Sequence, residues 1–89
     1  MWKNLNLFLG NLYNEVLWDE VFHAEDVDFV TNLWERVSDY STPFQWVTLE
    51  DELLKIWVDT SVESTANQVV AKILHEMYRL EHDQLWTIF

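Results

Sequence analysis

Histidine and carboxylate side chains are the residues of this 89-residue chain whose types could bind a metal or transfer protons. His75 and Glu76 begin like the His-Glu-x-x-His motif of zinc peptidases, but the next histidine, His82, follows seven residues later instead of four. On a helix that spacing separates the imidazoles by about 10 Å along the axis, too far for one ion. His23 and Asp26 form at most half of a site. We therefore expect no metal site and no cofactor.

The sequence also lacks the residues that other catalytic mechanisms require. The chain has no cysteine and one glycine, which excludes a thiol nucleophile, a disulfide framework and a glycine-rich phosphate loop. Its carboxylates fall on helix faces expected to be convex and wet, an environment that does not favour acid catalysis. We expect a protein that is not an enzyme.

The charge of the chain is strongly negative and unevenly placed. Sixteen acidic and five basic residues give a formal charge of −11. Residues 1–63 hold 13 acids and three bases, a net of −10, whereas residues 64–89 hold three acids and two bases, a net of −1. Such charge repels nucleic acid and anionic membranes, and exceeds what solubility requires. We expect a basic protein as the partner, without direct binding to nucleic acid or membrane.

Composition indicates the elements that carry these charges. An apolar share of 49% with six tryptophans excludes simple disorder, and one glycine with one proline argues against a turn-rich β protein. No uncharged run approaches the length of a membrane span, and the absence of cysteine suits a cytoplasmic setting. The sequence predicts a single all-α domain over residues 1–89, a small bundle of three to four helices.

Three helices follow from apolar residues at helical spacing. The first is predicted over Asn4–Asp19, tolerating Gly10 at some cost. The second is predicted over Ala24–Asp39, and the last over Val62–Trp86 after a cap from Asp59, Thr60 or Ser61. Their apolar faces are Leu5, Phe8, Leu9, Leu12 and Val16; Val27, Val30, Leu33, Trp34 and Val37; and Val62, Ala66, Val69, Ile73, Met77 and Leu80.

The segment between the second and last helices allows two interpretations. Ser41-Thr42-Pro43 breaks the chain, and Thr48 before three acids then resembles a capped helix start with Trp57 on its packed side. The alternative is an α+β fold in which Phe44–Leu49 and Leu53–Val58 form a hairpin, at about 44–58, packed on three helices. That acidic turn lacks glycine and asparagine, so we favour the helix.

A row of acids on the second helix is the main candidate site. At about 100° per residue, Glu25, Asp28, Glu35 and Asp39 fall on one line opposite the apolar face. A solvated helix face is the simpler interpretation; imitation of a phosphate backbone is the functional one. A flanking acidic field is expected from Glu15, Asp19, Glu20, Glu50, Asp51 and Glu52.

In size, charge and lack of catalytic motifs, the chain resembles the small acidic helical inhibitors made by phages and mobile elements. The resemblance implies an inhibitor that masks a nucleic-acid-binding surface of another protein, as a DNA mimic does. One alternative is a structural or adaptor module, including a homodimer, with an aromatic interface at Trp18 and Trp86, which lie off the apolar faces of their helices. These two tryptophans could instead fold back over the core. Another alternative is an antitoxin or immunity protein.

The last helix carries a basic strip of Lys72, His75, Arg79 and His82 on one face. Glu76 and Asp83 lie four residues after Lys72 and Arg79, a spacing that predicts ion pairs within the helix. The strip could alternatively contact an acidic surface, such as the second helix of another copy.

Overall fold

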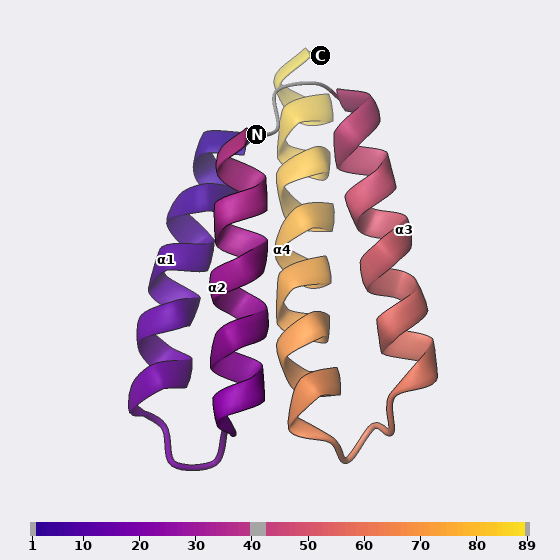
Figure 1. Ribbon diagram of the computed structural model, residues 1–89. Helices are drawn as coiled ribbons and strands as arrows, with labels where there is room; N and C mark the ends of the chain where they lie inside the picture. Colours follow the sequence, from indigo (N-terminus) through magenta and orange to yellow (C-terminus); the bar gives the residue numbers. More distant parts are fainter. Residues whose placement is uncertain (1, 40–42, 89) are drawn as a thin grey trace.

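The protein is an all-α bundle, as predicted. The computed structural model describes residues 2–39 and 43–88, with only the backbone described at 43, 44 and 84–88. It contains α1 (Trp2–Trp18), α2 (Ala24–Asp39), α3 (Pro43–Asp59) and α4 (Thr65–Ile88), and no strand occurs within those residues (Figure 1). The first helix lies within two residues of its predicted bounds, and the second matches its predicted bounds.

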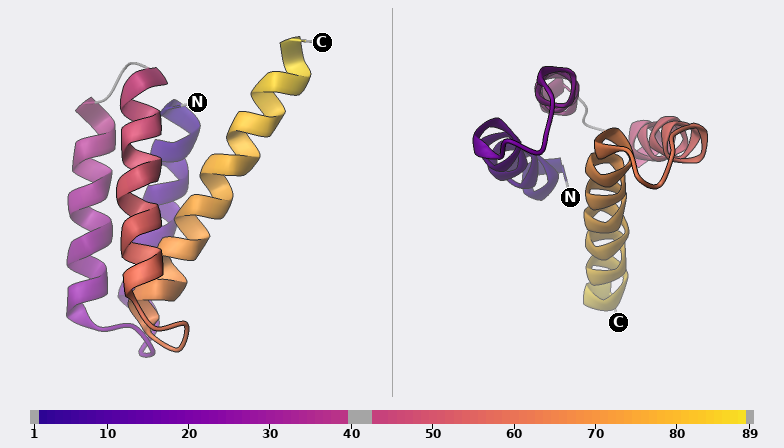
Figure 2. Two further views of the ribbon diagram at one scale, coloured as in Figure 1. Left: turned by 90° about the vertical axis from the view of Figure 1, so that its right-hand side faces the viewer. Right: turned by 90° about the horizontal axis from the view of Figure 1, so that it is seen from below.

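The helices form two hairpins that share one core. α1 packs against α2 and α3 packs against α4, while α4 also contacts both helices of the first hairpin. Figure 1 shows the two hairpin turns at the same end of the bundle, here termed the loop end (residues 17–28 and 57–66). Figure 2 shows α4 tilted away from the other helices, so that its C-terminal half projects beyond them. α4 is therefore the element that joins the two hairpins.

The core consists of one side of each helix. Of the residues predicted to face inward, Phe8, Val27 and Trp34 are partly buried against it. Fully or nearly fully buried are Leu5, Leu9, Leu12 and Val16 of α1; Val30, Leu33 and Val37 of α2; Trp46, Leu49 and Leu53 of α3; and Val69, Val70, Ile73, Leu74, Met77 and Leu80 of α4.

A tryptophan of α2 explains the glycine in the middle of α1. A Cβ atom at position 10 would lie 3.2 Å from Cζ2 of Trp34, tighter than ordinary van der Waals contact. The Trp34 ring is held in place because its Nε1 donates a hydrogen bond to Asn6 Oδ1 at 3.1 Å and its ring contacts Tyr13, with centroids 5.8 Å apart. Gly10 therefore allows α1 and α2 to approach closely.

The third helix begins earlier than predicted. It starts at Pro43 instead of Thr48, so Thr48 is an internal helix residue and the alternative hairpin is wrong. Proline suits the first position of a helix because it has no amide hydrogen to leave unpaired. Trp46 is buried and contacts Trp2 edge-on at 5.0 Å, which anchors this first turn to α1. The predicted break at residues 41–42 lies outside the described residues.

The last helix begins at Thr65, three residues later than predicted. Ser64 caps it: its Oγ accepts the Ala66 amide at 3.1 Å and the Asn67 amide at 3.4 Å. The buried side chain of Asn67 donates back to the carbonyl of Trp57 at 2.9 Å and so closes the end of α3. Val62 consequently lies in the turn, 78% exposed, and its predicted place on the apolar face is wrong.

Candidate partner-binding surface

The four acids predicted to align on the second helix lie on one exposed face of α2. Glu25, Asp28, Glu35 and Asp39 are all exposed, while the opposite side of the helix carries Val30 and Leu33 into the core. From Glu25 to Asp39 the helix rises roughly 20 Å. The structure thus places the four carboxylates in a row, here termed the α2 stripe.

The orientation of the α2 stripe is set by contacts at both ends of the helix. The Asp26 carboxylate is buried; its Oδ2 accepts the His23 amide at 3.0 Å and the Thr65 hydroxyl at 2.7 Å. Near the other end, Asn6 of α1 donates to Ser38 Oγ at 2.8 Å. Because the buried side of α2 is held in this way, the side that carries the stripe is fixed outward.

The ion pairs of the described chain lie away from the α2 stripe. Arg36, the nearest base on α2, contacts Glu52 of α3 at 2.7 Å. Lys72 contacts Glu15 at 2.9 Å, and Arg79 pairs with Glu76 and with Asp83 of its own helix. None of the ion pairs between described residues involves a carboxylate of the stripe. The charge of these four residues is therefore not neutralised within this part of the chain.

The flanking acids fall into two groups. Asp19, Glu20 and Asp51 are exposed, and the first two lie in the turn that precedes α2. Glu15 and Glu52 are ion-paired with bases. The predicted flanking field is thus weaker than the sequence suggests, because part of it is neutralised by contacts between helices.

Glu50 departs from the wet environment expected for the carboxylates. Its Oε1 accepts a hydrogen bond from Trp46 Nε1 at 2.8 Å, on the side of α3 that faces α4. Burial and a hydrogen bond with the carboxyl group of Glu81 raise the pKa of Glu50 to about 7, against the opposing effect of Trp46. At neutral pH Glu50 therefore carries only part of a negative charge.

Trp18 does not fold back over the core. It is 78% exposed at the end of α1, and its Nε1 donates a hydrogen bond to Asn14 Oδ1 at 3.0 Å. The side chain of Trp86 lies outside the described residues. Trp57, which was expected to pack, is 42% exposed, so that expectation is wrong.

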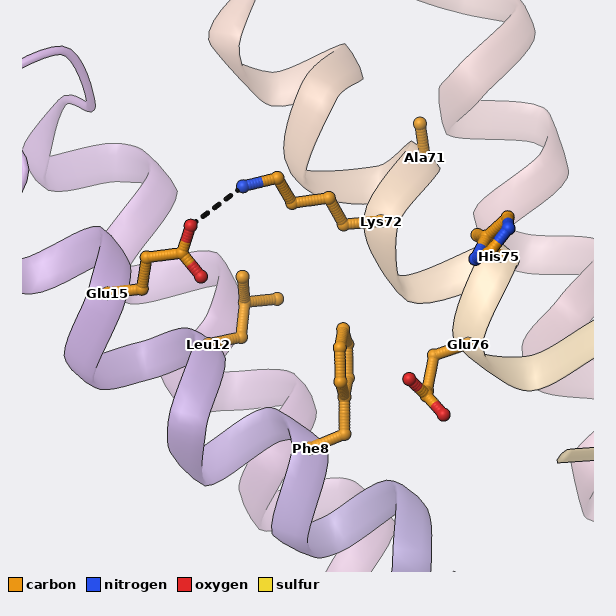
Figure 3. Close-up of a pocket in the computed structure, with 7 residues that line it drawn as sticks. All are labelled: Phe8, Leu12, Glu15, Ala71, Lys72, His75 and Glu76. Atoms are coloured by element: carbon orange, nitrogen blue, oxygen red, sulfur yellow. Dashed lines mark hydrogen bonds and ion pairs between the residues drawn. The ribbon is translucent and has the colours of Figure 1, made fainter. Parts of the chain in front are cut away.

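The basic strip of α4 borders an open groove of about 410 Å³ between α1 and α4. Figure 3 shows Phe8 and Leu12 on the α1 side of this groove and Lys72 and Glu76 on its α4 side, with the Glu15–Lys72 ion pair at one end. The spacing of Lys72 and Glu76 predicts an ion pair between them, but Lys72 pairs instead with Glu15 of α1. The hydrogen bond from Arg79 to Glu76 raises the pKa of Arg79. Because both bases have acidic partners, the strip offers little net positive charge to another molecule.

Several of these contacts have no signal in the sequence. Asn67 lies ten residues from the carbonyl it caps, and Glu81 lies 31 residues from Glu50. The Glu15–Lys72 ion pair likewise depends on how α1 and α4 are placed. Asp26 alone had a readable signal, since acids favour the first turn of a helix.

No family model matches the sequence, and no curated protein or solved structure matches the chain. Among the described helices, none combines the length and the apolar character required to cross a bilayer. Within the same residues, no group of three or more His, Asp or Glu side chains could hold a metal ion.

Proposed function

We propose that this protein binds a basic surface of another protein, of the kind that contacts nucleic acid, and masks it. The observation that supports this most directly is the contrast among its acids. Glu15, Glu52 and Asp83 form ion pairs and Asp26 caps a helix, whereas the four carboxylates of the α2 stripe face solvent without a basic partner in the described chain. Like charges on one helix destabilise it, so a surface of this kind suggests a use in binding.

The physical basis is replacement of phosphates by carboxylates on a rigid helix. A duplex carries one negative charge per roughly 3.4 Å along each strand, and its protein partners present rows of Lys and Arg. Four charges over roughly 20 Å are sparser than one strand. The exposed acids Asp19, Glu20 and Asp51 would therefore have to contribute to the field. On this proposal the protein is a non-catalytic cytoplasmic inhibitor that does not itself bind nucleic acid.

The test is affinity capture from the native host with the immobilised protein, followed by elution with increasing salt and with duplex DNA. We expect a basic partner that DNA displaces, with an apparent affinity that falls steeply as salt rises. The stripe variant E25Q/D28N/E35Q/D39N should lose this partner. Retention that is the same at low and high salt would contradict the proposal.

A charge-restored variant separates the position of the charges from their number. It adds four acids at exposed positions away from the stripe, so that the net charge returns to that of the natural chain; the added substitutions are N4D, N11D, V47E and Q68E. If the α2 stripe is the binding surface, the charge-restored variant remains as weak as the stripe variant. Full recovery would show that only net charge matters.

The exposure of Trp18 supports a second candidate, an adaptor or homodimer with an aromatic interface. Such an interface would survive high salt and would be lost on Trp18→Ser. An antitoxin or immunity protein that neutralises a basic toxin would behave like the first candidate. Identification of the captured partner distinguishes it from an inhibitor of a nucleic-acid-binding protein.

A further inference from the structure

The loop end exposes more large apolar side chains than the rest of the described surface. Of the nine such residues left exposed, the three most exposed are Trp18 and Val62, at 78%, and Val58, at 74%. Three more exposed apolar residues lie at this end, which gives six in all: Leu17, Trp18, Val21, Trp57, Val58 and Val62. The other three exposed residues, Leu7, Val47 and Tyr78, are distributed over three helices. A concentration of this kind at one end of a small protein is typical of an interaction site.

The two turns that carry these residues lie side by side. The hydrogen bond from Thr65 to Asp26 joins the first turn of α4 to the first turn of α2, so each hairpin turn borders the other. The view from below in Figure 2 shows both turns on the face turned to the viewer. The exposed apolar residues thus lie on these two turns and on the helix ends next to them, at one end of the molecule.

Polar contacts, not these apolar side chains, hold the first turn. The amide of Val21 donates to Asp19 Oδ1 at 3.0 Å, and the amide of Phe22 donates to the Asp19 carbonyl at 3.2 Å. Phe22 then packs against the core, while Val21 remains 61% exposed. A polar residue at position 21 could make the same backbone hydrogen bond.

The second turn is held in the same manner. Asn67 donates to Trp57 and Thr60, and Ser64 caps α4, so the backbone is fixed by groups other than Val58 and Val62. An ordered turn loses little conformational entropy when a partner binds. Val21, Val58 and Val62 are therefore presented on an ordered backbone that polar groups elsewhere in the turns hold in place.

The charge of the loop end limits what could cover it. It contains seven acids and neither Lys nor Arg; the acids are Asp19, Glu20, Glu25, Asp26, Asp28, Asp59 and Glu63. Asp26 is buried, and the other six are exposed around the apolar residues. Two copies placed end to end would bring like charges together, which disfavours self-association through this face. A partner with an apolar centre and a basic rim is complementary to it.

We propose that the loop end docks an apolar patch rimmed by Lys and Arg, with Trp18 and Val62 as its main apolar contacts. This inference rests on the proposed function, because it assigns an apolar docking surface to the same basic partner. The α2 stripe begins at the loop end with Glu25 and Asp28, so one partner could contact both surfaces. Charge would set the rate of association, and burial of the apolar residues would slow dissociation.

Two peptides test this inference without knowledge of the partner. The first is an amphipathic helical peptide of leucine and lysine; the second has the same composition in scrambled order, so that it has the charge but no apolar stripe. Amide NMR shifts of the labelled protein report where each peptide binds. We expect the amphipathic peptide to bind about tenfold more tightly than the scrambled one. Its shifts should centre on residues 17–28 and 57–66.

Matched variants separate this face from exposed apolar residues in general. W18S/V62S should weaken binding of the amphipathic peptide about tenfold and leave binding of the scrambled peptide unchanged. The control L7S/V47S removes two exposed apolar residues from positions of α1 and α3 outside the loop end and should change the binding of neither peptide. Circular dichroism checks that each variant is folded, and V21S/V58S provides a second pair at the loop end.

The outcomes for the two surfaces are distinct. Equal binding of both peptides, shifts confined to the α2 stripe, or dimerisation of the protein through the loop end would overturn the docking inference. If the stripe variant E25Q/D28N/E35Q/D39N still weakens the scrambled peptide in those cases, the proposed function stands. If that variant changes the binding of neither peptide, the proposed function fails. The effect of W18S/V62S on binding of the amphipathic peptide then still tests the docking inference.

Discussion

Thr65 donates a hydrogen bond from its hydroxyl to the buried carboxylate of Asp26, and this 2.7 Å contact joins the first turns of α4 and α2. The same Asp26 oxygen accepts the amide of His23, so a single carboxylate caps one helix and attaches it to another. Both residues belong to the loop end. The contact therefore links the stability of the bundle to the geometry of the surface proposed to bind a partner.

Asp26→Ala should destabilise the protein by about 2 to 3 kcal/mol, because the variant loses a helix cap and leaves the partly buried hydroxyl of Thr65 without its acceptor. Urea denaturation followed by circular dichroism measures the change. The control is Asp28→Ala, which removes an exposed acid from the same helix turn and should change stability by less than about 0.5 kcal/mol. Similar losses in both variants would show that Asp26 acts only through its charge.

The carboxyl pair between α3 and α4 should make stability depend on pH. The pKa of Glu50 is about 7 in the folded protein, against 4.5 for an unperturbed glutamate. The folded state therefore binds a proton more tightly than the unfolded state, and this stabilisation is full below about 4.5 and is lost as pH rises through about 7. Glu50→Gln should raise the melting temperature at pH 8 relative to the natural chain and leave it nearly unchanged at pH 4.

Glu63→Gln is the control for that measurement. It removes the same charge from an exposed glutamate in the turn before α4, whereas the neighbouring Asp51 is unsuitable because its charge raises the pKa of Glu50. Since many acids titrate as pH falls, only the difference between the two variants isolates Glu50. Parallel pH profiles for Glu50→Gln and Glu63→Gln would show that general repulsion, and not the Glu50–Glu81 contact, causes the dependence.

Gly10→Leu should destabilise the bundle by about 2 kcal/mol, because overpacking forces the fixed ring of Trp34 to move. Even the first added carbon would lie 3.2 Å from that ring. Asn11→Leu, at the neighbouring exposed position, should be nearly neutral. Thermal unfolding gives both values, and a Gly10→Leu protein as stable as the natural one would contradict the close packing of α1 on α2.

The acids at the two ends of the α2 stripe should affect stability differently. Glu35 and Asp39 lie near the C-terminus of α2, where the helix dipole disfavours negative charge, and they repel each other at i,i+4. The variant E35Q/D39N should gain about 0.5 kcal/mol in low salt, and the gain should shrink in high salt. E25Q/D28N, with the same charge change at the favoured end, should show no gain. A gain of equal size in both would indicate net repulsion alone.

Local signals predicted some of these elements and missed others. The bounds of α2 follow from acids in its first turn and an apolar face at helical spacing, and both are readable in residues 24–39. The start of α3 was missed because the acids after Thr48 resemble a capped helix start, although the buried Trp46, Leu49 and Leu53 recur at helical spacing. The start of α4 was missed because Asn67 closes the end of α3, which moves the cap to Ser64.

The candidate surface was predictable in part for the same reason. The alignment of the α2 stripe is a property of one helix, so its exposure follows from the apolar face opposite it. The neutralisation of Glu15 and Glu52 depends on bases from other helices, at distances in the sequence that no pattern specifies. The exposed valines of the loop end became visible only with the turns in place, since Val62 otherwise resembles a core residue of α4.

The two hairpins also bear on how fast the chain can fold. Each closes over a turn of five residues, Asp19–His23 and Thr60–Ser64, and the two most extensive helix contacts, α1 with α2 and α3 with α4, join neighbours in the sequence. Proteins dominated by such low contact order fold within microseconds to milliseconds. The long-range step that remains is docking of the hairpins through α4. A newly synthesised chain would therefore exist only briefly in a form with its apolar core exposed.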